Sequence, residues 1–302
     1  MNRKTIILAA LALTASASTV SAQQITEQDP SKHVVRTFPL NEKHLQFHSD
    51  ILGVDKSFSV ILPKSYDSET DRKYPVVYLL HGHGENDWEW ANINVAMINE
   101  QVAKCVADGS AAEMIIVKPN ATEYQSGYFN QEGWRYEDYF FNELIPAVES
   151  NFRVIADKGH RAIGGLSMGG GGSFYYAVRH PEMFSSVYAI SAAVGIGNSS
   201  TSSNSTTTNT RGVSPNIFNS RTDLTALSEQ QIEELKSVAF TLDIGDDDFL
   251  FDSNVATYQQ MKKLGLNCQF RVGEGTHATY YWYDALGKAL VYWTRHFSEQ
   301  CK

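Results

Sequence analysis

Ser167 stands at the centre of the run Gly-Leu-Ser-Met-Gly, residues 165–169, which suits it to nucleophilic chemistry. A free serine hydroxyl is a weak nucleophile, and a G-x-S-x-G run can present it on a strained turn between a strand and a helix. The flanking residues fit that context, since residues 161–164 are of strand type and residues 173–180 are of helix type before Pro181. The run therefore predicts a nucleophile elbow.

Four consecutive glycines, residues 169–172, follow the elbow at the start of the expected helix. Each glycine costs a helix about 1 kcal/mol relative to alanine. We expect close backbone packing around the elbow to compensate, because a glycine leaves room that no other residue leaves.

A serine nucleophile needs a histidine as its general base and an acid that orients the histidine, here in the chain order Ser, Asp, His. His277 fits the base, since it follows a Gly-rich stretch after a late strand. The acid is less clear, because Asp246, Asp247, Asp248 and Asp252 all follow the strand expected at residues 238–244. Position alone leaves the choice among these carboxylates open.

The run His81-Gly82-His83-Gly84 follows the strand expected at residues 76–80. A zinc site would need at least a third ligand, which the run does not supply. We interpret it as an oxyanion loop, in which the backbone N–H of His83 acts together with that of Met168. The chemistry expected here needs neither a metal nor an organic cofactor.

The remaining strand and helix signals alternate and predict a doubly wound α/β fold, with a mostly parallel central sheet and helices on both faces. Residues 45–52 and 57–62 alternate apolar and polar side chains around Gly53, which predicts an antiparallel hairpin at the sheet edge. The other expected strands are residues 76–80, 114–117, 161–164, 186–191 and 238–244, and the expected helices are residues 91–106, 138–151, 173–179 and 253–264.

The first 22 residues have the pattern of a secretory signal peptide, basic, then apolar, then small at the end. We therefore expect export to the periplasm or the medium, and one esterase-type domain over residues 23–302. Residues 198–210 are almost entirely Ser, Thr and Asn, which predicts a surface loop, either a tolerated insertion or a rim over the site.

The 302-residue chain has a formal net charge of −9, which argues against nucleic acid as a partner. No other segment reaches the roughly 18 apolar residues that a membrane span requires. Cys105, Cys268 and Cys301 cannot all pair, so any disulfide stays open, as does the oligomeric state.

These motifs together resemble the esterase D-like α/β-hydrolases, and among them the feruloyl and acetyl xylan esterases of carbohydrate esterase family one. The resemblance extends over roughly residues 45–297, and its matching runs are residues 78–88, 142–146, 160–171, 190–193 and 275–277. The family's acid lies in a G-x-x-D pattern, and the resemblance therefore implies Asp248 as the acid.

Two features depart from that family. Residues 275–277 read Gly-Thr-His where Gly-Gly-His is usual, and the polar stretch at residues 198–210 stands where relatives carry a variable, substrate-shaping segment. The implied substrate is thus less sharply defined than the implied mechanism.

The aromatic residues near the motifs could form a platform for a sugar or a phenolic acyl group, although aromatic side chains more often pack in the core. Trp88, Trp134 and Trp282 are the candidates we select, from a set that also holds Trp90, Tyr280 and Tyr281.

The sequence thus predicts an exported serine ester hydrolase that removes feruloyl or acetyl groups from plant cell-wall polysaccharide. Three alternatives stay open: an acyltransferase, an esterase of siderophores or other small esters, and an inactive carbohydrate-binding envelope protein.

Overall fold

The computed structural model describes residues 23–28, 41–91, 98–122, 127–195 and 224–298. The predicted signal peptide, the polar stretch at residues 198–210 and Cys301 lie outside these residues. Within them, Cys105 and Cys268 are buried free thiols. No helix in the described ranges combines the length and the apolar character needed to cross a membrane.

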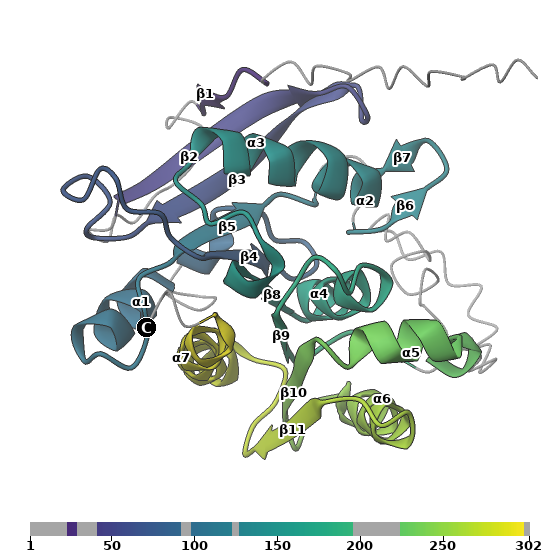
Figure 1. Ribbon diagram of the computed structural model, residues 1–302. Coiled ribbons are helices and arrows are strands. Elements are labelled where there is room, and N and C mark those ends of the chain that lie inside the picture. Colours follow the sequence, from purple (N-terminus) through teal and green to yellow (C-terminus); the bar gives the residue numbers. More distant parts are fainter. Residues whose placement is uncertain (1–22, 29–40, 92–97, 123–126, 196–223, 299–302) are drawn as a thin grey trace, which may run out of the picture.

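A central sheet organises the described part of the chain, with strands in the order β1-β2-β3-β5-β4-β8-β9-β10-β11 (Figure 1). Its strands are β1 (Thr26–Glu27), β2 (Asn41–Ser49), β3 (Val54–Leu62), β4 (Val76–Leu80), β5 (Ile115–Pro119), β8 (Arg161–Leu166), β9 (Ser186–Ile190), β10 (Ala239–Gly245) and β11 (Cys268–Gly273). A separate small hairpin consists of β6 (Asn130–Gln131) and β7 (Trp134–Arg135).

The sheet is antiparallel at its N-terminal edge and parallel elsewhere. Strands β2 and β3 pair antiparallel from Asn41 opposite Leu62 to Ser49 opposite Val54, and Gly53 takes a φ of 70° in the turn between them. From β5 across β4, β8, β9, β10 and β11 every pairing is parallel. This arrangement confirms the expected α/β-hydrolase fold with an antiparallel edge hairpin.

Helices cover both faces of the sheet (Figure 1). The α-helices are α1 (Ile98–Ala107), α2 (Tyr136–Tyr139), α3 (Ile145–Asn151), α4 (Met168–Arg179), α5 (Glu229–Leu235), α6 (Phe251–Lys263) and α7 (Thr279–His296). A wide π-type turn, η3 (Phe140–Leu144), joins α2 to α3, and short 3-10 turns are η2 (Glu89–Ala91), η4 (Lys158–His160) and η6 (Leu224–Ala226). Helices α1 and α7 lie on one face, and α3, α4 and α6 lie on the other.

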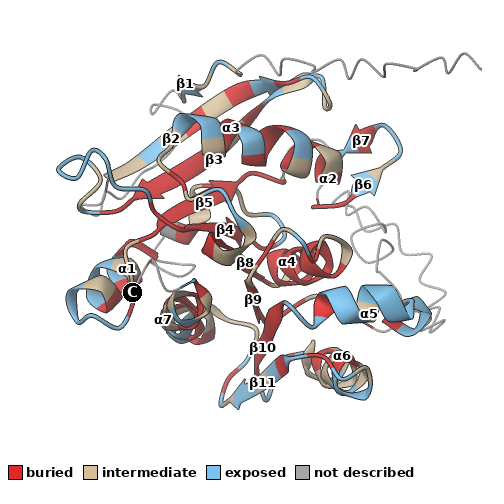
Figure 2. Cartoon of the chain, in the orientation of Figure 1, coloured by how far each residue is buried: buried red, intermediate tan, exposed pale blue. Residues whose placement is uncertain are grey.

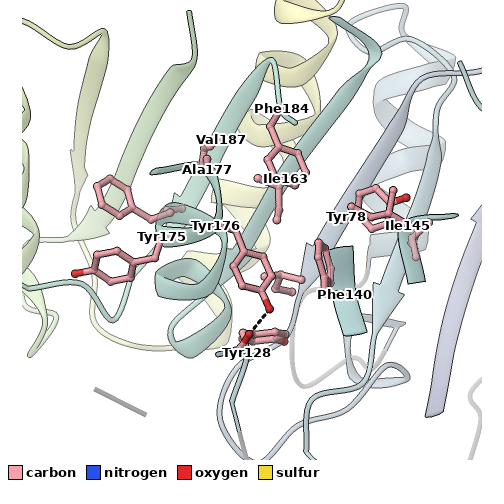
Figure 3. Close-up of a cluster of buried hydrophobic side chains, with 14 of the residues drawn as sticks. Tyr78, Tyr128, Phe140, Ile145, Ile163, Tyr175, Tyr176, Ala177, Phe184 and Val187 are labelled. Carbon is pink, nitrogen blue, oxygen red and sulfur yellow. Dashed lines mark hydrogen bonds between the residues drawn. The ribbon is translucent and has the colours of Figure 1, made fainter. Parts of the chain in front are cut away.

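Alternate residues of the central strands supply two separate cores, because successive strand side chains point to opposite faces. In β4, Val76, Tyr78 and Leu80 join the cluster under α3 and α4, whereas Val77 and Leu79 join the cluster under α1 and α7. Figure 2 shows the central strands buried throughout, and Figure 3 shows the first cluster, with Tyr78 and Phe140 side by side. Burial on both faces explains why these strands are nearly continuous apolar runs.

Several elements differ from their expected bounds or were not expected, α5 among them, and two of these elements, α4 and α7, contribute to the site. Helix α4 begins at Met168, directly after the serine, and not at Ser173, so the four glycines form its first turns. Helix α7 was not predicted, although it is the longest helix described. Its buried residues follow a helical period, namely Tyr281, Ala285, Leu286, Ala289, Leu290, Tyr292 and Trp293.

Candidate active site

Ser167 occupies the sharp turn between β8 and α4, with a φ of 52° and a ψ of −115°. Such a conformation is strained for any residue other than glycine, and it persists only where the surrounding structure enforces it. Three backbone hydrogen bonds do so here. The Ser167 N–H donates to Ile190 O at 2.9 Å, and the Ser167 carbonyl accepts from Gly171 N at 3.0 Å and from Ala193 N at 2.8 Å. The turn therefore presents the hydroxyl as a nucleophile elbow does.

The glycines around Ser167 lie where a side chain would collide with backbone. A Cβ atom on Gly169 would lie 2.2 Å from the Leu80 carbonyl oxygen, and one on Gly165 would lie 2.5 Å from the same atom. A Cβ on Gly171 would lie 2.4 Å from Ala193 O. The glycines thus allow the end of β4 and the loop after β9 to pack on the start of α4, which is the compensation expected from the sequence.

His277 lies between Ser167 and Asp248 and has a hydrogen-bonding partner on each side. Its Nδ1 is 2.9 Å from Asp248 Oδ2, and its Nε2 is 3.0 Å from Ser167 Oγ. An ionised carboxylate only accepts, so Nδ1 carries the proton and Nε2 is left to accept from the serine hydroxyl. The structure therefore brings together the three residues predicted from the sequence, in the geometry of a nucleophile, a base and an orienting acid.

The structure also distinguishes Asp248 from the competing carboxylates. Asp248 is buried, whereas Asp246, Asp247 and Asp252 are exposed. Asp246 Oδ1 accepts instead from Gly275 N at 2.9 Å, in the loop that leads to His277. Burial opposes ionisation of Asp248, but hydrogen bonds from His277, from the backbone of Leu250 and from Ser191 outweigh it and hold the pKa of Asp248 below its usual value.

Ser191 is a site residue that the sequence did not reveal. It is fully buried at the end of β9 and has a φ of 44°, the second non-glycine residue of the described chain with a positive φ. Its hydroxyl bonds to the Asp248 carboxylate and accepts the indole N–H of Trp282 at 3.1 Å. The run Ile190-Ser191-Ala192-Ala193 matched the family resemblance, but no sequence signal indicated this contact.

The loop after β4 is held by a neutral histidine. His81 Nδ1 donates to Gly82 O at 2.7 Å, and His81 Nε2 accepts from Ala121 N at 2.9 Å. Burial lowers the pKa of His81 to about 4, so both ring nitrogens serve the loop and not a proton transfer. Tyr176 donates to Tyr128 O, as Figure 3 shows, and Tyr128 donates to the His81 carbonyl at 3.0 Å, which ties the loop to α4.

His83 and Met168, the expected oxyanion donors, belong to neighbouring segments. His83 is exposed in the loop after β4, and Met168 is the first residue of α4. The two segments meet at Gly169, whose Cβ position would lie 2.6 Å from the His81 carbonyl oxygen. Their role as donors stays a prediction.

Glu85 adds a partly buried acid to this loop. Its carboxylate accepts from Gly82 N at 2.8 Å, and burial raises the pKa of Glu85 to about 6. Among the described residues, no group of three His, Cys, Asp or Glu side chains could hold a metal ion.

Of the three tryptophans proposed to bind substrate, the structure brings Trp282 to the site. Its ring meets the His277 imidazole edge to face, with centroids 5.1 Å apart. Trp88 stacks on His44 of β2 and donates to Gln28 Oε1 at 3.2 Å, and Trp134 is buried in the core. Substrate binding by the last two stays a prediction, and their described contacts are those of packing residues.

Comparison with known proteins agrees with this geometry. Residues 49–300 match the family model "Esterase", described as "Putative esterase". The chain belongs to this esterase family. The match confirms the predicted class, a carboxylic ester hydrolase that resembles feruloyl and acetyl esterases.

The relatives of this esterase include proteins named as feruloyl and acetyl esterases. It is 35% identical over 153 residues to an endo-1,4-beta-xylanase/feruloyl esterase of Xylanibacter ruminicola, which covers 48% of the chain and 20% of that relative. It is 24% identical over 270 residues to an acetyl esterase of Caldicellulosiruptor saccharolyticus, covering 83% of the chain and 97% of the relative. The esterase thus spans only part of some curated relatives that it matches.

A solved structure of a ferulic acid esterase superposes on this esterase with a TM-score of 0.77 and 38% identity. The match covers 87% of the chain and 100% of that structure. A feruloyl esterase module from Clostridium thermocellum, complexed with sinapinate, shares the fold at 20% identity and a TM-score of 0.64.

Proposed function

We propose that this chain is an exported serine esterase that hydrolyses feruloyl or acetyl esters of plant cell-wall polysaccharide through an acyl-enzyme. The observation that carries the proposal is the alignment of Ser167, His277 and Asp248, at 3.0 and 2.9 Å, on a strained elbow. Membership of an esterase family supports ester hydrolysis, and the proposed mechanism uses neither a metal nor an organic cofactor.

In the proposed reaction, Ser167 Oγ attacks the ester carbonyl while its proton passes to His277 Nε2. The carbonyl oxygen becomes negatively charged and is stabilised by the backbone N–H groups of His83 and Met168. Asp248 stabilises the imidazolium that forms, because its carboxylate accepts the Nδ1–H.

The tetrahedral intermediate then collapses. The bond from carbon to the alcohol oxygen breaks, and His277 gives its proton to that oxygen, which leaves the acyl group on Ser167. A water molecule then attacks the acyl carbon with His277 as the base. The bond from that carbon to Ser167 Oγ breaks, His277 returns the proton to Ser167 Oγ, and the carboxylic acid is released.

The substrate proposal favours a phenolic acyl group slightly over acetyl. Trp282 contacts the His277 ring edge to face, so aromatic surface borders the site. The ferulic acid esterase and the xylanase/feruloyl esterase among its relatives support the same choice. Stacking adds about 0.5 to 1.5 kcal/mol beyond area burial, so the preference is moderate.

The test compares kcat/KM for methyl ferulate with kcat/KM for an acetylated xylo-oligosaccharide, and includes short p-nitrophenyl esters. We expect hydrolysis of both natural ester types, with methyl ferulate faster by up to about tenfold. A strong excess for acetyl would make the protein an acetyl xylan esterase, and inactivity on both would overturn the substrate class. Transfer of the acyl group to a hydroxyl group of an added sugar or lipid, in place of water, would favour the acyltransferase alternative.

A further inference from the structure

Phe249 is a large apolar side chain that the fold leaves in solvent. It directly follows Asp248 and is 76% exposed. Its ring lies against the imidazole of His277, with centroids 4.6 Å apart and planes at 52°. The runs that match known esterases do not include this residue, and its position beside the proposed base indicates a role in the site.

Trp282 is the second aromatic neighbour of the His277 imidazole, beside Phe249. The Trp282 ring is partly buried, meets the imidazole at 87°, and is anchored through its indole N–H on the buried Ser191. Trp282 is therefore the inner support of His277. Phe249, being mostly exposed, borders the imidazole where solvent and substrate reach it.

The chemistry of the proposed reaction defines which part of a substrate passes this point. The acyl carbon bonds to Ser167 Oγ, and the alcohol oxygen must reach His277 Nε2 to receive its proton as the carbon–oxygen bond breaks. The alcohol part of the ester thus extends over the imidazole, whereas the acyl part stays with the serine. A side chain on the solvent side of the imidazole therefore borders the alcohol part of the bound ester.

We propose that Phe249 binds the sugar ring that carries the ester, and so sets the preference for carbohydrate over simple alcohols. This inference rests on the proposed function and deepens it. A sugar ring has an apolar face of C–H groups, which would cover the exposed Phe249 ring and remove apolar surface from water. A methyl ester is too small to do so.

The experiment measures kcat/KM for two esters with the same acyl group, methyl ferulate and feruloyl arabinose, in the wild type, Phe249→Ala and Phe249→Tyr. We expect Phe249→Ala to lower the ratio of sugar ester to methyl ester by about three- to tenfold. Phe249→Tyr retains the ring and should keep the wild-type ratio. Val272→Ala is the matched control, because Val272 is another exposed apolar residue, 49% exposed at the end of β11, and its ratio should equal that of the wild type.

An unchanged ratio in Phe249→Ala would overturn the inference, even if both rates fell, because equal losses would mean that Phe249 only supports His277. Wild-type activity separates this result from a failure of the proposed function. If the wild type hydrolyses acetyl but not feruloyl esters, the same ratio is measured with methyl acetate and acetylated xylose.

Discussion

Ser191 Oγ accepts the indole N–H of Trp282 at 3.1 Å, and the same hydroxyl bonds to the carboxylate of Asp248. One buried hydroxyl thus connects the acid that orients His277 to the aromatic ring that supports it. The positive φ of Ser191 aims the hydroxyl at both partners, in the same way that the positive φ of Ser167 aims the nucleophile.

Replacing Ser191 should therefore impair turnover more than binding. We expect Ser191→Ala to lower kcat by about tenfold with little change in KM, because a hydrogen bond to a charged group contributes about 1.5 to 3 kcal/mol. Ser186→Ala, a buried serine at the opposite end of β9, serves as the control and should keep its kcat. Equal losses of kcat in the two variants would mean that Ser191 has only a structural role.

Asp248 should be far more important for the rate than its neighbours. Asp248→Asn would favour the wrong imidazole tautomer and should reduce kcat by about 10³- to 10⁴-fold. Asp246→Asn removes a charge whose oxygen accepts from Gly275 N, so we expect a change of less than about tenfold. Steady-state kinetics of both variants decide the assignment, and a crippled Asp246→Asn beside an active Asp248→Asn would refute it.

Glu85 should make stability depend on pH. Its pKa is about 6 in the folded protein and near 4.5 when unfolded, so between these values the folded state holds more protons. The free energy of unfolding therefore falls as pH rises through this window, by up to about 2 kcal/mol, and the loss is complete above pH ~6.

Glu85→Gln can still accept from Gly82 N and has no charge to bury. The melting temperature of Glu85→Gln minus that of the wild type should therefore become more positive as the pH is raised from 4 to 8. Thermal unfolding of both proteins across that range provides the test, and parallel pH curves would show that Glu85 is not the group responsible.

Close packing at the elbow predicts an unusual response to alanine. Gly171→Ala would place a Cβ 2.4 Å from the backbone oxygen of Ala193 and should destabilise the protein by about 1 to 3 kcal/mol. Gly287→Ala in α7 meets only the flexible end of the Gln101 side chain, so its cost should be smaller. Denaturant unfolding of the two variants measures the difference, and equal effects would contradict the packing argument.

Much of the fold followed from the sequence because buried parallel strands are continuous apolar runs, and β4, β8, β9 and β10 all have that character. Helix α7 escaped prediction because its first turn, Tyr280-Tyr281-Trp282, looked like an aromatic surface. The apolar spacing from Tyr281 to Trp293 would have shown a helix whose inner face is core.

The site was predictable where chemistry dictates residue type and order, which is why Ser167 and His277 were identified directly. Asp248 needed the family resemblance, since four carboxylates had the same local context. Ser191 and Phe249 could not be identified, because a positive φ and an exposed ring are products of tertiary structure. Trp88 and Trp134 were selected by proximity in sequence, and the structure gives them packing contacts on β2 and in the core.

The central claim is that Ser167 is the nucleophile, and labelling with a fluorophosphonate followed by peptide mass spectrometry tests it most directly. The account predicts one modified residue, Ser167, loss of esterase activity in proportion to labelling, and a fall in kcat of about 10³-fold or more in Ser167→Ala. Labelling at another residue, or a Ser167→Ala variant with near wild-type kcat, would contradict it.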